Sequence, residues 1–188
     1  MMEKAVKEIR LVDMRALEEG MIVEGYAAVF DTVTNLGWMN EVIDRHAFDN
    51  ADMSDIVMKY NHEDSILPMA RTRGGSLTFS IDDHGLKIRA ELPNTTQNRD
   101  IYILIENRVL TKMSFAFTVR TEEYDYDTDT RKILEFDKIF DVSVVDVPAY
   151  ETTEIYARSK EEYEEEKRQY EEKKIAFEKQ KLELMLSL

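Results

Sequence analysis

The segment MSFAFTV at residues 113–119 contains the first candidate for chemistry, Ser114. In an extended strand, the methionine, the two phenylalanines and the valine of this segment point to one side and must face the core. Ser114 then stands on the opposite face with Ala116 and Thr118, where small side chains leave room for another chain or a substrate. A serine hydroxyl becomes a nucleophile only beside a base, and most serines on a strand face have no such role.

The three histidines are the candidates for a general base. His62 directly follows an expected strand at residues 56–60, and a strand end holds an imidazole in a fixed position. A surface histidine without a role is the simpler interpretation of this position alone. His84 lies in an expected turn, and His46 stands at the start of an expected short helix. Nothing around these two residues indicates catalysis.

Asp141 and Asp146 are candidate carboxylates on one expected strand. They lie five residues apart, so strand alternation turns them to opposite faces. Asp141 shares its face with Ser143, whereas Asp146 lies two residues before Pro148, near the end of the strand.

An acidic stretch at residues 125–129 has the alternating aspartates of a calcium loop. The glycine that such a loop needs at its sixth position is Thr130, and the glutamate at its twelfth position is Phe136. We therefore reject a calcium site.

Composition narrows the class of protein. The chain has 188 residues, room for one domain and an appendage, and no cysteines, which excludes disulfides, thiolate metal sites and cysteine nucleophiles. Lys and Arg total 25 against 39 Asp and Glu, a net charge of -14 that disfavours nucleic-acid binding. No stretch approaches the ~20 apolar residues of a membrane span, and residues 1–10 lack the apolar core of a signal peptide. We expect a soluble, intracellular protein without cofactor or metal.

Residues 1–157 carry the patterns of strands that would position these candidates. Alternation and turn residues predict three hairpins, a further strand and one helix that follows a motif like a capping box. The hairpins pair residues 9–17 with 21–30, 77–81 with 86–92, and 112–126 with 132–147; the strand is 56–60 and the helix follows residues 94–97. We expect an α+β fold, a mostly antiparallel β-barrel with a few short helices.

Residues 158–188 form a charged tail, rich in Glu, Lys and Gln and free of Gly and Pro. This composition predicts one long C-terminal helix at about 159–186. Aromatic or aliphatic residues recur every seven positions, at Tyr156, Tyr163, Tyr170, Phe177 and Leu184. One apolar residue per heptad fits either a solvated helix or a weak partner-binding or self-associating helix. We expect two parts, a domain at 1–157 and this tail at 158–188.

Short motifs follow one another in a fixed order over about residues 20–157. They are GYAAVF at 25–30, EVI at 41–43, AF at 47–48, NHE at 61–63, GL at 85–86, MSFAF at 113–117 and DVSVVDVPA at 141–149. In this order they resemble the prohead (capsid maturation) proteases of tailed phages. That family is distantly similar to the herpesvirus assemblins, which implies an assemblin-like barrel surrounded by helices.

The resemblance implies a serine endopeptidase without a cofactor. Ser114 maps onto the nucleophile, and His62 onto the base that takes its proton and later protonates the leaving amine. The family's third member, usually Glu, stands at the start of the VSxV strand and maps onto Asp141, which would hold the imidazole tautomer. Backbone N–H groups near Ser114 or after Val147 are candidates for the oxyanion hole.

The sequence departs from the family pattern at three places. Arg45 and His46 stand where the family commonly has Pro-Gly, and Ala116 stands where a glycine often follows Ser-Phe. The Leu-Gly usual after the histidine is replaced around residues 69–70, near the site, which bears on substrate preference.

The resemblance also implies a biological role. The protease would act inside the assembling prohead in the cytoplasm of the bacterial host, and would cleave the scaffolding region of the major capsid protein, or a scaffolding protein, and itself. Self-association is expected, and the acidic surface fits a protein that must not bind the incoming genome. The alternative is a non-enzymatic internal scaffold or capsid-assembly module of the same fold with a decayed site. The presence of Ser114, His62 and Asp141 together argues against decay.

Overall fold

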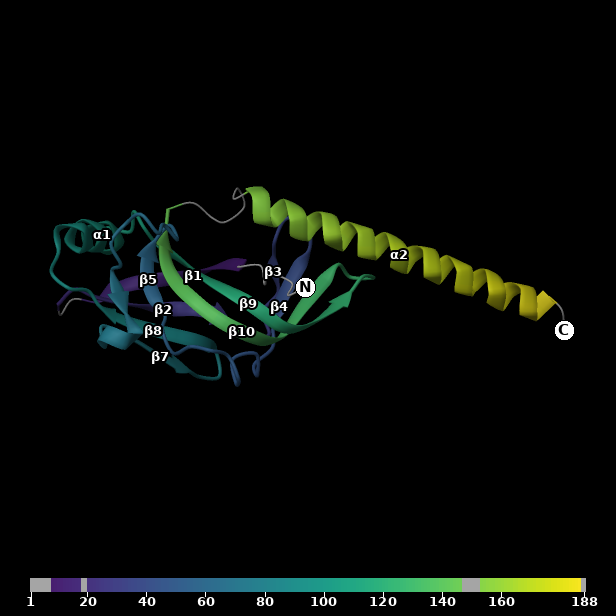
Figure 1. Cartoon of the computed structure of the whole chain (residues 1–188), viewed down its shortest axis with the longest axis horizontal. Coiled ribbons are helices and arrows are strands. Elements are labelled where there is room, and N and C mark those ends of the chain that lie inside the picture. The colour runs from purple at the N-terminus through teal and green to yellow at the C-terminus, as the bar shows by residue number, and fades with distance from the viewer. Residues whose placement is uncertain (1–7, 18–19, 147–152, 187–188) are drawn as a thin grey trace.

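The computed structural model describes residues 8–17, 20–146 and 153–186. The strands are β1 Glu8–Leu17, β2 Ile22–Val29, β3 Thr34–Asn35, β4 Asn40–Ile43, β5 Val57–Tyr60, β6 Ala70–Arg71, β7 Leu77–Ile81, β8 Gly85–Glu91, β9 Lys112–Asp125 and β10 Thr130–Val145. The helices are α1 Thr96–Glu106 and α2 Thr153–Leu186, with a 3-10 turn at Thr72–Gly74. Figure 1 shows α1 at one end of the bent sheet and α2 extending beyond the other end.

The strands form one sheet in the order β3-β4-β10-β9-β1-β2-β8-β7. The three predicted hairpins are confirmed as the antiparallel pairs β1–β2, β7–β8 and β9–β10. Both β4 and β5 pair in parallel with β10, at different places along its length. The α+β class is confirmed. The hydrogen-bonded path ends at β3 and β7 and does not close among the described residues, so the predicted barrel remains unconfirmed.

The turn between β7 and β8 is fixed by a side chain and a glycine. Asp82 Oδ1 accepts hydrogen bonds from the backbone N–H groups of His84 and Gly85. A Cβ on Gly85 would lie 2.0 Å from the carbonyl oxygen of Ala28, so only glycine lets the hairpin approach β2.

Helix α1 starts where the sequence predicts. The N-cap is Thr95, whose side chain accepts a hydrogen bond from the N–H of Asn98. Asn98 is itself buried, and its amide donates to the carbonyl oxygens of Met69 and Pro93, which ties the helix to the chain beside it. The expected short helix at His46 is wrong, because residues 45–50 form turns.

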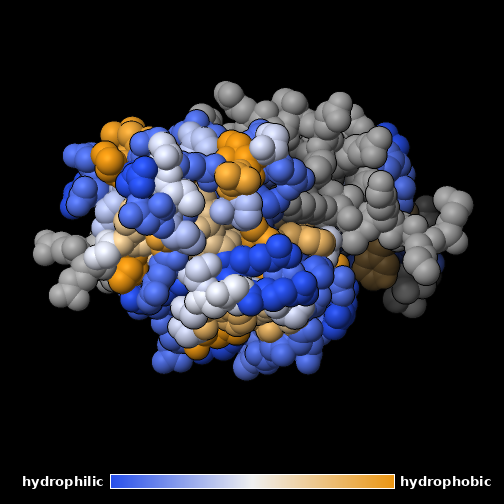
Figure 2. Space-filling view, turned by 60° about the vertical axis from the view of Figure 1, so that its left-hand side comes forward, coloured by the Kyte–Doolittle hydropathy of each residue, from blue (hydrophilic) through white to orange (hydrophobic). Residues whose placement is uncertain are grey.

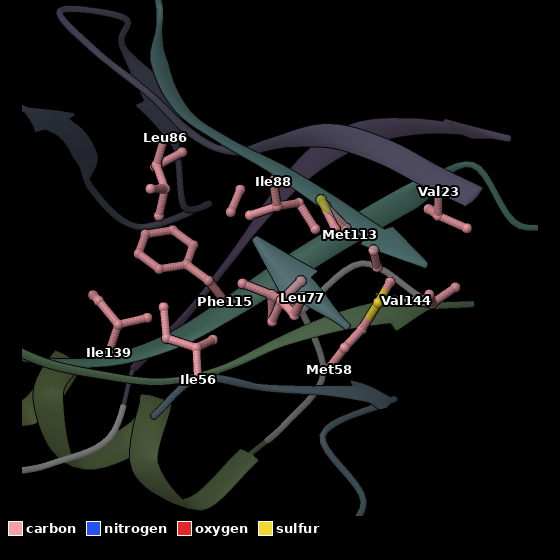
Figure 3. Packing of buried hydrophobic residues seen from close by; sticks show 14 of the residues in the cluster. Val23, Ile56, Met58, Leu77, Leu86, Ile88, Met113, Phe115, Ile139 and Val144 are labelled. Carbon is pink, nitrogen blue, oxygen red and sulfur yellow. The ribbon is translucent and has the colours of Figure 1, made fainter. Parts of the chain in front are cut away.

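The large residues of β9 face the core, as their alternation predicts. Met113, Phe115 and Phe117 are fully buried. Figure 3 shows side chains from β2, β5, β7, β8 and β10 gathered around Met113 and Phe115. The opposite face of β9 differs from the expectation. Ser114 and Ala116 are also fully buried, so the small-residue face is covered rather than open.

Helix α2 starts at Thr153, earlier than predicted, and packs on the β9–β10 hairpin of the same chain. Tyr163 is 4% exposed and packs in an aromatic cluster with Leu36, Trp38, Met39, Tyr124 and Tyr126. Its hydroxyl donates to Asp129 at 2.7 Å, and Lys167 pairs with the same carboxylate. Tyr163 of the apolar stripe therefore contacts this chain itself, whereas Phe177 is 66% exposed. The side chain of Leu184 lies outside the described residues, and the division at 157/158 stays a prediction.

Candidate active site

Ser114 is positioned by the long β9–β10 ladder. Its Cα pairs with that of Ser143 on β10 and, on the other side, with that of Leu11 on β1. Ser114 and Ser143 are both fully buried. Directly opposite residues of an antiparallel pair have Cβ atoms about 5 Å apart, so the two serines are neighbours on one face of the sheet.

His62 reaches the same place from β5, which lies beside β10. The parallel register pairs Tyr60 with Val144, and the next residue, Asn61, donates its backbone N–H to the carbonyl oxygen of Val144 at 2.8 Å. Asn61 and His62 then adopt left-handed backbone angles, with φ of 51° and 58°. Two such residues in succession are rare outside glycine and are costly unless the surroundings enforce them. This turn at the end of the predicted strand directs His62 back over β10.

The structure brings His62 and Asp141 into contact. Asp141 Oδ1 lies 2.5 Å from His62 Nδ1, and its side chain is 1% exposed. The ladder register shifts between Ile139 and Asp141, where β10 is irregular. Lys59 Nζ lies 3.8 Å from the second carboxylate oxygen of Asp141 and also pairs with the exposed Asp64. A buried carboxylate is thus held between an imidazole and an ammonium group.

Ser143 adds a hydroxyl to this cluster. It donates to Asp141 Oδ1 at 3.1 Å and lies 3.2 Å from His62 Nδ1. The sequence placed Ser143 on the face of Asp141, but its contact with the histidine went unpredicted, as did that of Lys59 with Asp141. Both follow from the register of β10 with β5, which pairs Ser143 with Lys59.

Two atoms that proton transfer would use have no hydrogen-bond partner among the described residues. They are Ser114 Oγ and His62 Nε2, and both are buried. With Nδ1 bound to a carboxylate, Nε2 is the nitrogen left to act as a base. A serine hydroxyl, an imidazole and a carboxylate gathered on adjacent strands can carry out acyl transfer.

The other candidates lie outside this cluster. Asp146 is exposed, just beyond β10, and accepts a hydrogen bond from Tyr60 Oη at 3.0 Å. Burial, followed by the bond to Asp146, raises the pKa of the Tyr60 hydroxyl. His46 and His84 are exposed and lie in turns. The described residues contain no group of histidines and carboxylates suited to hold a metal ion.

A family model described as caudovirus prohead serine protease matches residues 10–169. The chain belongs to this family. No curated protein and no solved structure matches the chain. The match extends past residue 158 and includes Tyr163 and Lys167, so the part of α2 that packs on the β9–β10 hairpin lies within the family region.

Membership makes the chain a serine protease of phage capsid maturation. A hydrolase of this kind needs a serine nucleophile. Ser114 is a buried serine that lies directly across the β9–β10 ladder from Ser143. Ser143 in turn contacts both His62 and Asp141. In the part of the chain that the structure describes, no helix has the length and apolar character to span a bilayer.

Proposed function

We propose that this prohead protease cleaves the scaffolding region of the major capsid protein, or a separate scaffolding protein, by attack of Ser114 on the peptide bond. The observation that supports the proposal best is the 2.5 Å contact between His62 and Asp141, beside Ser114 and within a serine protease family. A decayed scaffold would have no use for a buried imidazole–carboxylate pair, because burying such a pair costs more than an apolar contact.

The proposed roles of Ser114, His62 and Asp141 in peptide-bond cleavage are those of a nucleophile, a general base and a stabilising carboxylate. His62 Nε2 takes the proton of Ser114 Oγ as the oxygen forms a bond to the scissile carbonyl carbon. The imidazolium then gives this proton to the departing amine nitrogen, and the acyl group stays on Ser114. In the second half of the reaction, water attacks the acyl carbon on Ser114 while His62 takes its proton. The ester bond breaks, the serine oxygen regains a proton from the imidazolium, and the acid product leaves. Asp141 stabilises the imidazolium and keeps its own negative charge throughout.

Access of the substrate needs a change in the protease. Ser114 is fully buried, so an extended peptide reaches it only after the cover over this face of β9 has moved. We propose that assembly in the prohead favours this opening, so that cleavage is fastest once the substrate surrounds the protease. Backbone N–H groups beside Ser114 are the proposed oxyanion donors.

The distal part of α2 is the proposed delivery segment. Its exposed apolar residues are Ile175, Phe177, Leu182 and Met185, and it projects beyond the sheet (Figure 1). On the face in Figure 2, by contrast, apolar residues form separate patches among hydrophilic ones. We propose that the projecting helix binds capsid or scaffold helices, or a second copy, in the host cytoplasm. The protease also removes this tail from itself.

Co-expression with the major capsid protein of the same phage tests the proposed function. Intact-mass measurement should find a shortened capsid protein with the wild type and the full-length precursor with Ser114→Ala. Particles that assemble and keep uncleaved capsid protein with both proteins would favour the alternative, a scaffold without activity.

A further inference from the structure

Ser143 lies among the residues of the proposed site without an assigned role. Its Cα pairs with that of Ser114, its hydroxyl donates to Asp141 Oδ1 at 3.1 Å, and it lies 3.2 Å from His62 Nδ1. It is fully buried, so these groups, rather than bulk water, surround its oxygen. Ser143 therefore contacts or adjoins every member of the proposed triad.

The proton positions around Ser143 follow from the donors and acceptors. His62 Nδ1, Asp141 Oδ1 and Ser143 Oγ form a closed triangle with sides of 2.5, 3.1 and 3.2 Å. The carboxylate has no proton, and the single hydroxyl proton of Ser143 is donated to it. Ser143 then turns a lone pair towards Nδ1, so both groups that face this nitrogen are acceptors. Nδ1 carries the proton of the neutral ring, and Nε2 keeps the lone pair of a base.

We propose that Ser143 is a positioning residue of this protease, acting through Asp141 and His62. The inference rests on the proposed roles of these two residues. The hydroxyl holds Asp141 Oδ1 in one orientation and gives the Nδ1 proton a second acceptor. Both bonds fix the imidazole plane, and with it the direction of the Nε2 lone pair. A ring held by one bond alone can turn, and small misplacements of a base cost a large part of its rate.

The variant Ser143→Ala removes the hydroxyl and keeps the volume nearly unchanged. We expect kcat on a cleavable peptide to fall on the order of 10- to 100-fold with KM unchanged. The rate of reaction with a serine-directed phosphonate should fall by a similar factor. The variant Ser143→Thr restores the hydroxyl and should recover most of the rate. An unchanged kcat in Ser143→Ala would overturn the proposal.

A double-mutant cycle separates positioning from packing. If Ser143 acts through Asp141 and His62, adding Ser143→Ala to Asp141→Ala lowers activity by a smaller factor than Ser143→Ala does in the wild type, because one of the two groups that Ser143 orients is already gone. A packing role would instead multiply the two losses, and that result would refute the inference. Circular dichroism and the melting temperature of each variant accompany the rates.

Thr118→Val is the matched control. Thr118 is 3% exposed on the Ser114 face of β9, and its hydroxyl donates to Asp137 at 3.4 Å, away from the proposed triad. Removing this hydroxyl should leave kcat unchanged; a loss as large as that of Ser143→Ala would mean that any buried hydroxyl of this face matters equally, and would contradict positioning by Ser143.

Two further outcomes are distinguishable. Should Ser143→Ala fail to fold, Ser143→Cys replaces it, because a thiol fills the site but is a weak donor, and the same loss of kcat is expected. If the wild type neither cleaves capsid protein nor reacts with the phosphonate, the proposed function fails and this inference with it. If the wild type reacts and the Ser143 variants react equally fast, only the inference on Ser143 fails.

Discussion

At the scale of single residues, the arrangement around His62 depends on two strands that reach β10 from either side. The β9–β10 ladder brings Ser114 opposite Ser143, and the left-handed turn after β5 brings His62 to Asp141. Each contact involves residues far apart in sequence, so the geometry exists only when the whole sheet has formed. Asp141 lies inside this arrangement and Asp146 outside it.

The two aspartates give the first prediction. Asp141→Asn should lower kcat by about 10⁴-fold, the scale of a lost triad carboxylate, because the imidazole loses its anionic partner and its tautomer is no longer fixed. Asp146→Asn serves as the control and should change kcat less than about 3-fold, since it alters an exposed side chain that bonds to Tyr60 outside the cluster. Steady-state rates of the wild type and both variants on the same peptide test this prediction. Equal losses, or a larger loss in Asp146→Asn, would mean that the acid is misassigned.

At the scale of elements, α2 is held by a cluster of pH-sensitive groups on the β9–β10 hairpin. The hydrogen bond from Lys167, followed by that from Tyr163, lowers the pKa of Asp129. Burial, followed by the bond to Asp129, raises the pKa of Tyr163, and burial with a bond to Glu166 raises the pKa of Tyr126 to about 12. Two aspartates of the stretch that resembled a calcium loop thus bind the helix, since Lys174 also pairs with Asp127 at 2.7 Å.

These pKa shifts predict that α2 is held on the hairpin most firmly between about pH 4 and about pH 10. A lowered carboxyl pKa contributes stability above about pH 4, the ordinary aspartate value, that is lost as the pH falls through the folded value. A raised tyrosine pKa contributes stability below about pH 10 that is lost as the pH rises through the folded value. The packing of α2 should therefore weaken at both extremes.

Trp38 makes this measurable, because it is the only tryptophan and its ring centroid lies 5.2 Å from that of Tyr163. Its fluorescence should change between pH 7 and pH 3 in the wild type. Asp129→Asn should show the acid-like spectrum already at pH 7, with little further change. An identical acid transition in both proteins would show that Asp129 does not hold the helix.

Particular residues show which features could be predicted from the sequence. Alternation predicted the hairpins and the buried face of Phe115 and Phe117, because side-chain period is a local property. The short strands β3, β4 and β6 have too few residues to show a pattern, and they went unpredicted. The contact of Ser143 with His62 depends on a parallel pairing between β5 and β10, and the burial of Ser114 depends on what lies over β9. Neither is encoded in nearby residues.

At the scale of the whole molecule, the protease consists of a sheet, whose strands β9 and β10 carry residues of the proposed site, and a helix that projects beyond one end of that sheet (Figure 1). Tyr163, Lys167 and Lys174 of α2 contact the β9–β10 hairpin, and the large apolar side chains described beyond Lys174 are exposed. The contacts of α2 with the hairpin extend to Lys174. We propose a boundary there as an alternative to the predicted one at residue 158, and two truncations test which is right.

Truncation after Lys174 removes only the projecting part and should leave the melting temperature within about 2 °C. Truncation after Arg158 also removes Tyr163 and uncovers its aromatic cluster, and should lower the melting temperature by roughly 5 °C while the sheet still folds. Differential scanning calorimetry measures both. Equal melting temperatures for the two truncations would favour the boundary at 158. Incorporation of each protein into proheads then reports on delivery by the distal helix.

The central claim is that Ser114 is a nucleophile activated by His62, and covalent labelling tests it most directly. The wild type is treated with a serine-directed peptidyl phosphonate, and the modified residue is located by mass spectrometry of peptides. We predict one adduct, on Ser114, that is absent in Ser114→Ala and slowed by orders of magnitude in His62→Ala. Labelling of another serine, or equal labelling in His62→Ala, would contradict the account.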